Sequence, residues 1–115
     1  VVFGSAGGQL EGQAARLSFE GACEIAGDAA FHLRLSDGAQ FNGNGQSVTL
    51  TTVPEFEDAF CICTHTSVAR FAGQSFAGSA TGSRYYLSAN GVIDSGGVVL
   101  PGDGAGSVQT GGLYL

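Results

Sequence analysis

Apolar and polar side chains alternate along several short stretches of the chain. In the clearest stretch, Phe31, Leu33 and Leu35 are apolar, and His32 and Arg34 lie between them. Successive side chains of a β-strand point to opposite faces, so this alternation predicts a strand with a buried face and a solvent face that carries His32. The same pattern predicts further short strands at 17–20, 47–51, 68–71, 74–77 and 85–89.

One stretch, from Asp58 to His65, is apolar on both faces. Phe60 and Ile62 would point one way, and Cys61 and Cys63 the other. A strand of this kind is typical of the middle of a sheet that is covered on both sides. No window of ten or more residues has apolar side chains at the i, i+3, i+4 spacing of a helix, so the prediction is an all-β protein.

Turn signals separate the predicted strands. Asn or Asp followed by Gly occurs at 37–38, 42–43, 44–45 and 90–91. These pairs accept a positive φ and are typical of tight hairpins between antiparallel strands. We therefore expect a single domain, an antiparallel β-sandwich or small barrel, with its core in residues 1–95.

The C-terminal segment, residues 96–115, combines many glycines with apolar side chains. A flexible linker would contain Gly and Ser without this apolar content. Burial against neighbouring subunits would offset the entropic cost of ordering so much glycine, so we expect an assembly segment. Together with the tyrosine-containing strand before it, the expected assembly interface consists of Tyr85, Tyr86, Val98, Val99, Leu100, Leu113, Tyr114 and Leu115.

Charge narrows the possible partners. The chain has a net charge of −6, with four arginines and no lysine. Sequence-independent nucleic-acid binding needs a cluster of cationic side chains, so no nucleic-acid partner is expected. The longest apolar runs are only a few residues, which argues against a membrane partner. Charged residues make up 12% of the chain, against about 25% in a typical soluble domain, and such a neutral surface suits packing into a large assembly.

Cys61, Cys63 and His65 are the best candidates for a metal site, with Cys23 as a fourth ligand. In one strand, Cys61 and His65 would lie roughly 13 Å apart, whereas zinc ligands converge to about 2–2.3 Å from the ion. We therefore predict no metal site and three small buried thiols. Free thiols fit assembly in a reducing cytoplasm, with a disulfide to Cys23 as the alternative.

Catalytic patterns are weak. No G-x-S-x-G nucleophile motif occurs, and His32 has no evident acidic or nucleophilic neighbour in the sequence. Glu55, Glu57 and Asp58 form an acidic cluster, and a solvated loop is the preferred interpretation over a glycosidase pair or calcium ligands. The prediction is therefore a non-enzymatic protein with no catalytic residue and no cofactor.

Tyr85 and Tyr86 are adjacent in a predicted strand, so they should face opposite ways. We expect one in the core and the other at the surface or at an interface, where tyrosine is favoured. A sugar-binding platform formed by these tyrosines is the alternative, which would make a host surface glycan a partner.

Four stretches near the C-terminus resemble a known pattern. They read FAGSATGSRYYL at 76–87, VIDSGG at 92–97, LPGDGAGS at 100–107 and TGGLY at 110–114. This order is similar to the C-terminal ends of small virion proteins and tail fibres of tailed bacteriophages. The chain departs from that pattern in having only two adjacent glycines at 96–97, where longer glycine runs are usual.

The resemblance implies a β-rich virion surface protein, often trimeric, and carries no catalytic residue with it. The leading hypothesis is a capsid-decorating or cementing protein, assembled in the cytoplasm of the bacterial host, whose partners are further copies of itself and a major capsid protein. Decoration is preferred because the 115 residues contain no evident stem, repeat or coiled coil that would join a fibre. The alternative is a tail-fibre or receptor-binding tip that recognises a host glycan or protein.

Overall fold

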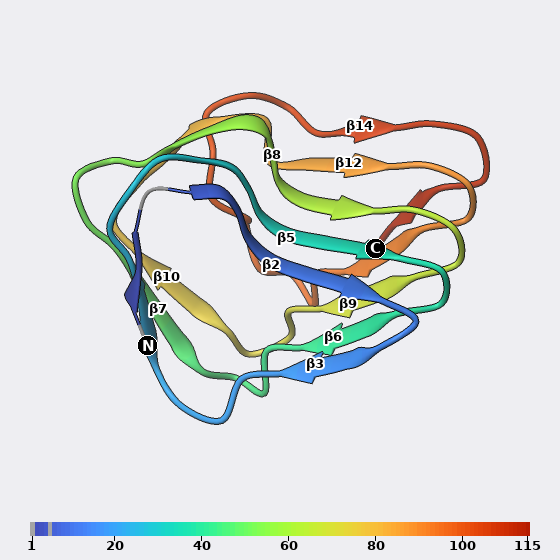
Figure 1. Ribbon diagram of the computed structural model, residues 1–115, viewed down its shortest axis with the longest axis horizontal. Helices are drawn as coiled ribbons and strands as arrows, with labels where there is room; N and C mark the ends of the chain where they lie inside the picture. Colours follow the sequence, from blue (N-terminus) through green and yellow to red (C-terminus); the bar gives the residue numbers. More distant parts are fainter. Residues whose placement is uncertain (1, 5) are drawn as a thin grey trace.

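Three parallel β-sheets wind around a common core in this computed structural model, which describes residues 2–4 and 6–115 (Figure 1). Sheet A contains β1 (Val2–Phe3), β4 (Cys23–Ile25), β7 (Ser47–Leu50) and β10 (Ser75–Ala77). Sheet B contains β2 (Ala6–Gln13), β5 (Ala29–Ser36), β8 (Glu55–Cys63), β12 (Tyr85–Leu87) and β14 (Ser107–Val108), and β11 (Thr81–Gly82) also pairs with β8. Sheet C contains β3 (Arg16–Ser18), β6 (Gln40–Asn42), β9 (Val68–Arg70), β13 (Val92–Asp94) and β15 (Leu113–Tyr114).

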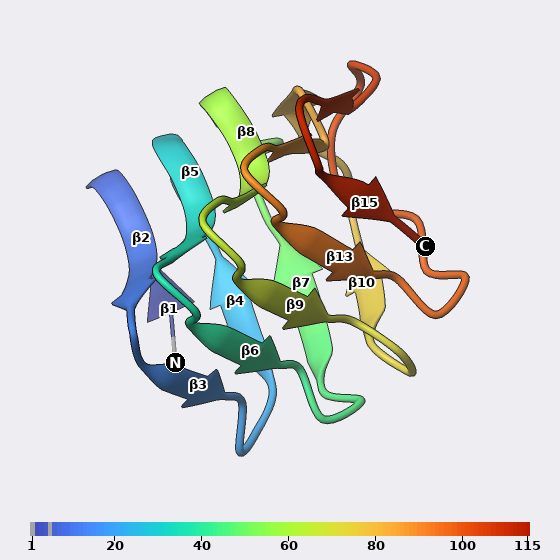
Figure 2. The same cartoon turned by 90° about the vertical axis from the view of Figure 1, so that its right-hand side faces the viewer.

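The chain visits the three sheets in turn and then starts again, which makes a β-solenoid of about five rungs. Figure 2 shows this order in sheet C, where β3, β6, β9, β13 and β15 lie side by side in chain order. Rungs differ in length: Val92 pairs with Leu113, 21 residues on, and Ser47 pairs with Ser75, 28 residues on. The all-β prediction is confirmed, but the expected antiparallel sandwich or barrel is wrong, because every strand pairing is parallel.

The turn signals were placed correctly but interpreted wrongly. Asp37 and Gly38, with φ of 54° and 76°, connect β5 of sheet B to β6 of sheet C. Asn44 and Gly45 likewise connect sheet C to sheet A. A positive φ reverses the chain in a hairpin, but it also turns the chain through a corner. In this solenoid the Asx-Gly pairs at 37–38, 44–45 and 90–91 form corners, and the hydrogen-bonded neighbours of each strand come from adjacent rungs.

Side chains from all three sheets fill the interior. Leu35, Cys63 and Leu87 lie in adjacent paired positions of sheet B, and each is fully buried. Burial of such apolar surface is the main stabilising contribution to a fold of this kind. The largest side chains of the core form a group of aromatic contacts, made by Phe19, Phe41, Phe56, Phe60, Phe71 and Phe76.

The side chains of β5 do not alternate regularly between the two faces of the strand. The register between β5 and β8 shifts between Ala29 and Phe31, as at a β-bulge. Leu33 and Leu35 belong to the main core, as predicted, whereas Phe31 belongs to a separate cluster with Ala59 and Ile62. The Arg34 guanidinium lies over the Phe31 ring, 4.4 Å from its centroid. The predicted inward face is therefore correct for Leu33 and Leu35, at the C-terminal end of β5, and wrong for Phe31.

His32, which was expected on the solvent side, is buried. Its ring stacks on Phe60 with centroids 4.9 Å apart, and its edge contact with Phe3 has a centroid distance of 5.1 Å. Nδ1 of His32 donates a hydrogen bond to Oε1 of Gln9 at 2.8 Å. Gln9, His32 and Phe60 thus occupy successive rungs of one inward-facing column, which we call the inner column.

Candidate functional site: the two ends of the solenoid

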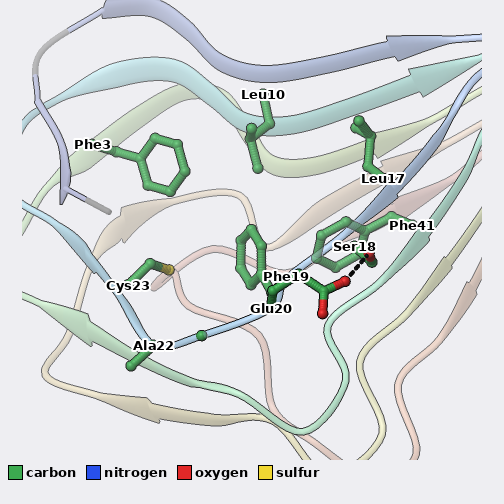
Figure 3. A pocket seen from close by; sticks show the side chains of 10 residues that line it. Phe3, Leu10, Leu17, Ser18, Phe19, Glu20, Ala22, Cys23 and Phe41 are labelled. Carbon is green, nitrogen blue, oxygen red and sulfur yellow. Dashed lines mark hydrogen bonds between the residues drawn. The ribbon is translucent and has the colours of Figure 1, made fainter.

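The N-terminal end of the solenoid is an open apolar cavity of about 450 Å³ (Figure 3). Phe3, Leu10, Leu17 and Phe19 come from the first rung and its exit, and each is only partly buried. Phe41, from the second rung, forms part of the lining and is itself buried. These are core side chains whose covering layer is missing from the described residues.

Unpaired strand edges surround this cavity. Among the described residues, β1, β2 and β3 each stand at the end of their sheet and have a neighbour on one side only. An edge strand presents backbone N–H and C=O groups that another strand can bond. The N-terminal end therefore combines exposed apolar side chains with free backbone hydrogen-bonding groups, which is the combination that a further strand layer would satisfy.

The C-terminal end also has edge strands, β10, β14 and β15, but there the last rung packs several apolar side chains against the core. Leu100 is 1% exposed and packs into the main core, and Pro101 is also buried. The rings of Tyr85 and Tyr114 stack with centroids 4.1 Å apart. Ser95 holds the last residue, since its backbone N–H and its Oγ both donate to the Leu115 carbonyl oxygen. Residues 96–115 thus form the fifth rung.

Asp103 fixes the glycine-rich part of this rung. Its Oδ1 accepts a hydrogen bond from the Gly82 N–H at 2.8 Å, and its own N–H donates to the Gly82 carbonyl at 3.1 Å. Gly104 also donates to the Gly82 carbonyl, and it accepts from the Arg84 N–H. Rungs approach closely here, because a Cβ on Gly102 would overlap the Gly82 carbonyl oxygen. The glycines of this segment therefore allow one rung to lie against the next.

The eight residues expected at an assembly interface divide into two groups. Tyr85, Leu100 and Tyr114 pack inside the chain, and Val98 is half-buried. Exposed apolar side chains remain, with Val99 71% exposed and Leu115 59% exposed. Tyr86 and Leu113 are also exposed. The role of these residues in assembly stays a prediction, and the exposed members are the ones available for it.

The two adjacent tyrosines face opposite ways. The ring of Tyr85 stacks on the ring of Tyr114, whereas Tyr86 on β12 is 38% exposed. A platform for a sugar ring would need a free aromatic face, and only Tyr86 of this pair has one. The side chains beside it in sheet B are those of Ile62 and Ser107, from β8 and β14.

The cysteines lie inside the solenoid. Cys61 and Cys63 are fully buried with their Sγ atoms 3.9 Å apart, and Cys23 is almost buried beside the N-terminal cavity. All three are free thiols, and burial raises the pKa of Cys61, with a further contribution from the Cys63 thiol. His65 lies apart from them at an exposed turn. Within residues 2–4 and 6–115, no three His, Cys, Asp or Glu side chains are placed to hold a metal ion.

His32 and the acidic cluster, the other titratable candidates, lie in different parts of the molecule. Burial lowers the pKa of His32 to about 3, so its ring is neutral near pH 7. Glu55, Glu57 and Asp58 are exposed on β8, where the Glu55 N–H donates to Oδ1 of Asp28. This acidic cluster lies on a strand and not in the expected loop.

No helix of the described part of the chain is long and apolar enough to cross a membrane.

Sequence reasoning missed the residues of the N-terminal end. Leu10, Leu17 and Phe19 look like any inward strand residue in the sequence. Only the stacking of rungs shows that nothing in the described residues covers them.

No protein family, curated protein or solved structure with which the chain was compared matches it.

Proposed function

We propose that this chain is a non-enzymatic structural protein on the surface of a bacteriophage particle, where it decorates or cements the capsid as an oligomer. The observation that carries the proposal is the open N-terminal end, with its apolar cavity and free strand edges. Exposed apolar patches with unpaired strand edges mark surfaces that bind other proteins. The assignment to a virion rests on the resemblance of residues 76–115 to the ends of phage virion proteins.

The proposed partners are further copies of the chain, as a homotrimer, and a major capsid protein. The small number of charged side chains favours a surface that packs against other proteins.

The first experiment tests the assembly surface. Ala22 is exposed at the rim of the N-terminal cavity, so Ala22→Glu places a charge there without disturbing the core. Ala77→Glu, on the outward face of sheet A, is the matched control. Light scattering should show an oligomer for the unmodified protein and for Ala77→Glu, and a lower mass for Ala22→Glu. An unmodified protein that is a monomer at all concentrations contradicts the proposed self-association.

The second experiment tests the location. Cryo-electron microscopy of particles assembled with the chain should show its density at capsomer junctions. Density on the tail alone rejects decoration and supports the tail-fibre or receptor-binding alternative. Particles that contain no copy of the chain reject the virion assignment altogether.

A further inference from the structure

Arg84 continues the inner column at the C-terminal end of the solenoid. The Phe60 N–H donates to the Ser83 carbonyl at 2.9 Å, and Tyr85 pairs with Cys61. Arg84 therefore lies beside Phe60, in the position that His32 occupies in the second rung. A column that begins with Gln9 and passes through two aromatic rings ends in a guanidinium group. Arg84 itself is half-buried.

The Arg84 side chain has no anionic partner in the described residues. Its Nε atom is shielded from solvent and has no hydrogen-bond acceptor there. The described residues form one ion pair within 4.0 Å, between Arg34 and Glu11. Asp103, the carboxylate of the adjoining segment, accepts its hydrogen bond from the Gly82 N–H. The residue as a whole is half-buried, so the unpartnered Nε–H is the part of the group that departs from the rule that buried polar groups in native proteins are hydrogen-bonded.

Two cavities meet at this side chain. One, of about 400 Å³, is lined by Arg84, Tyr85, Val98 and Tyr114 among others. The second, of about 190 Å³, is lined by Arg84, Phe76 and Pro101 among others. Val99 and Leu100 line both, and neither cavity has a carboxylate in its lining. The walls of the larger cavity are mostly apolar, and Arg84 supplies the charged side chain in the lining of both cavities.

We propose that Arg84 and the two cavities beside it form a binding site for an aliphatic carboxylate. The carboxylate would accept hydrogen bonds from the guanidinium group, whose fork of N–H donors matches two carboxylate oxygens. The hydrocarbon part would contact Val98, Val99 and Tyr114. This inference goes beyond the assembly role, since it concerns the C-terminal end of the isolated chain and does not depend on the N-terminal surface.

The experiment uses hexanoate as the probe and follows the Nε–H resonance of Arg84 in ¹⁵N-labelled protein. Hexanoate should shift this resonance saturably, and hexanamide at equal concentration should not, because it lacks the charge. The dissociation constant of hexanoate should rise about ten-fold or more in Arg84→Met, the loss expected for one charged hydrogen-bonding group. Arg70→Met, at an exposed position on β9, is the matched control and should bind as the unmodified protein does.

Three results would overturn the proposal. The first is an Arg84 resonance in the unmodified protein that hexanoate does not move. The second is hexanoate binding by Arg84→Met that is as tight as in the Arg70→Met control. The third is an equal response to inorganic phosphate, which would show a site for small anions without preference for a hydrocarbon body. The first and third measurements use the unmodified protein, so they decide the matter even where Arg84→Met fails to fold.

Discussion

Gly106 lies directly against the ring of Tyr85, in a space where no side chain fits. A Cβ atom built on Gly106 would overlap the ring carbons of Tyr85. The opposite neighbour of this ring is Tyr114, with which it stacks. The glycine of the fifth rung therefore allows an aromatic pair to join the fourth rung to the fifth.

Substitution of Gly106 should therefore destabilise the protein. In Gly106→Ala the new methyl group must displace the Tyr85 ring, and forced repacking of this kind typically costs about 1–3 kcal/mol. Urea denaturation followed by circular dichroism would measure the loss. Gly21→Ala is the control, because no atom lies near a Cβ at that position. Equal stability of the two variants would show that Tyr85 moves aside without cost.

Leu100 should be the main apolar anchor of the fifth rung. Leu100→Ala removes a side chain that is 1% exposed, and such truncations cost about 2–5 kcal/mol. The neighbouring Val99 is 71% exposed, so Val99→Ala should change the free energy of unfolding by less than about 0.5 kcal/mol. Thermal and urea unfolding of the two variants would test the difference. A small loss in Leu100→Ala would mean that the last rung contributes little to the stability of the fold.

Stability should fall in acid partly because of His32. Its pKa is lowered by burial from 6.5 to about 3, so between these values the unfolded chain binds a proton that the folded chain excludes. The contribution of His32 to the free energy of unfolding is therefore constant above pH 6.5. As the pH falls from 6.5 toward 3, this contribution decreases by at most about 1.4 kcal/mol per pH unit.

The comparison that isolates this effect uses three proteins. His32→Phe should show a shallower decline of the unfolding free energy between pH 6.5 and 3, since no group titrates at that position. His65→Gln, changed at an exposed turn, should decline as the unmodified protein does. Parallel curves for all three would contradict a buried neutral imidazole.

The thiols should differ in their rates of alkylation. Cys23 borders the open N-terminal cavity and is 8% exposed, whereas Cys61 and Cys63 are fully shielded. A small maleimide should modify Cys23 first in the native protein, and Cys61 and Cys63 should react only on unfolding. Mass spectrometry of peptides after timed labelling would give the order. Early modification of Cys61 would show that the core opens more readily than the packing implies.

Much of the secondary structure was predictable from local pattern. The expected strands at 47–51, 68–71, 74–77 and 85–89 correspond to β7, β9, β10 and β12. The candidate site was less predictable, since Leu10 and Leu17 carry no signal that separates an uncovered inward residue from a covered one. The inward position of His32 was also hidden, because the sequence there alternates perfectly and only the packing of its ring against Phe3 and Phe60 shows that it lies inside.

The sequence by itself determined that the chain forms short strands, where it turns, and that its last segment needs a surface to pack on. Period-two alternation and Asx-Gly pairs are local properties, so they are visible in the residues themselves. The tertiary structure alone decided which strands pair, in which direction, and that residues 96–115 pack on their own fourth rung. Parallel and antiparallel strands bury the same alternating face, and rungs of 21 to 28 residues share no repeated motif that would reveal the solenoid. Pairing depends on contacts between residues a whole rung apart, and these exist only once the chain has folded.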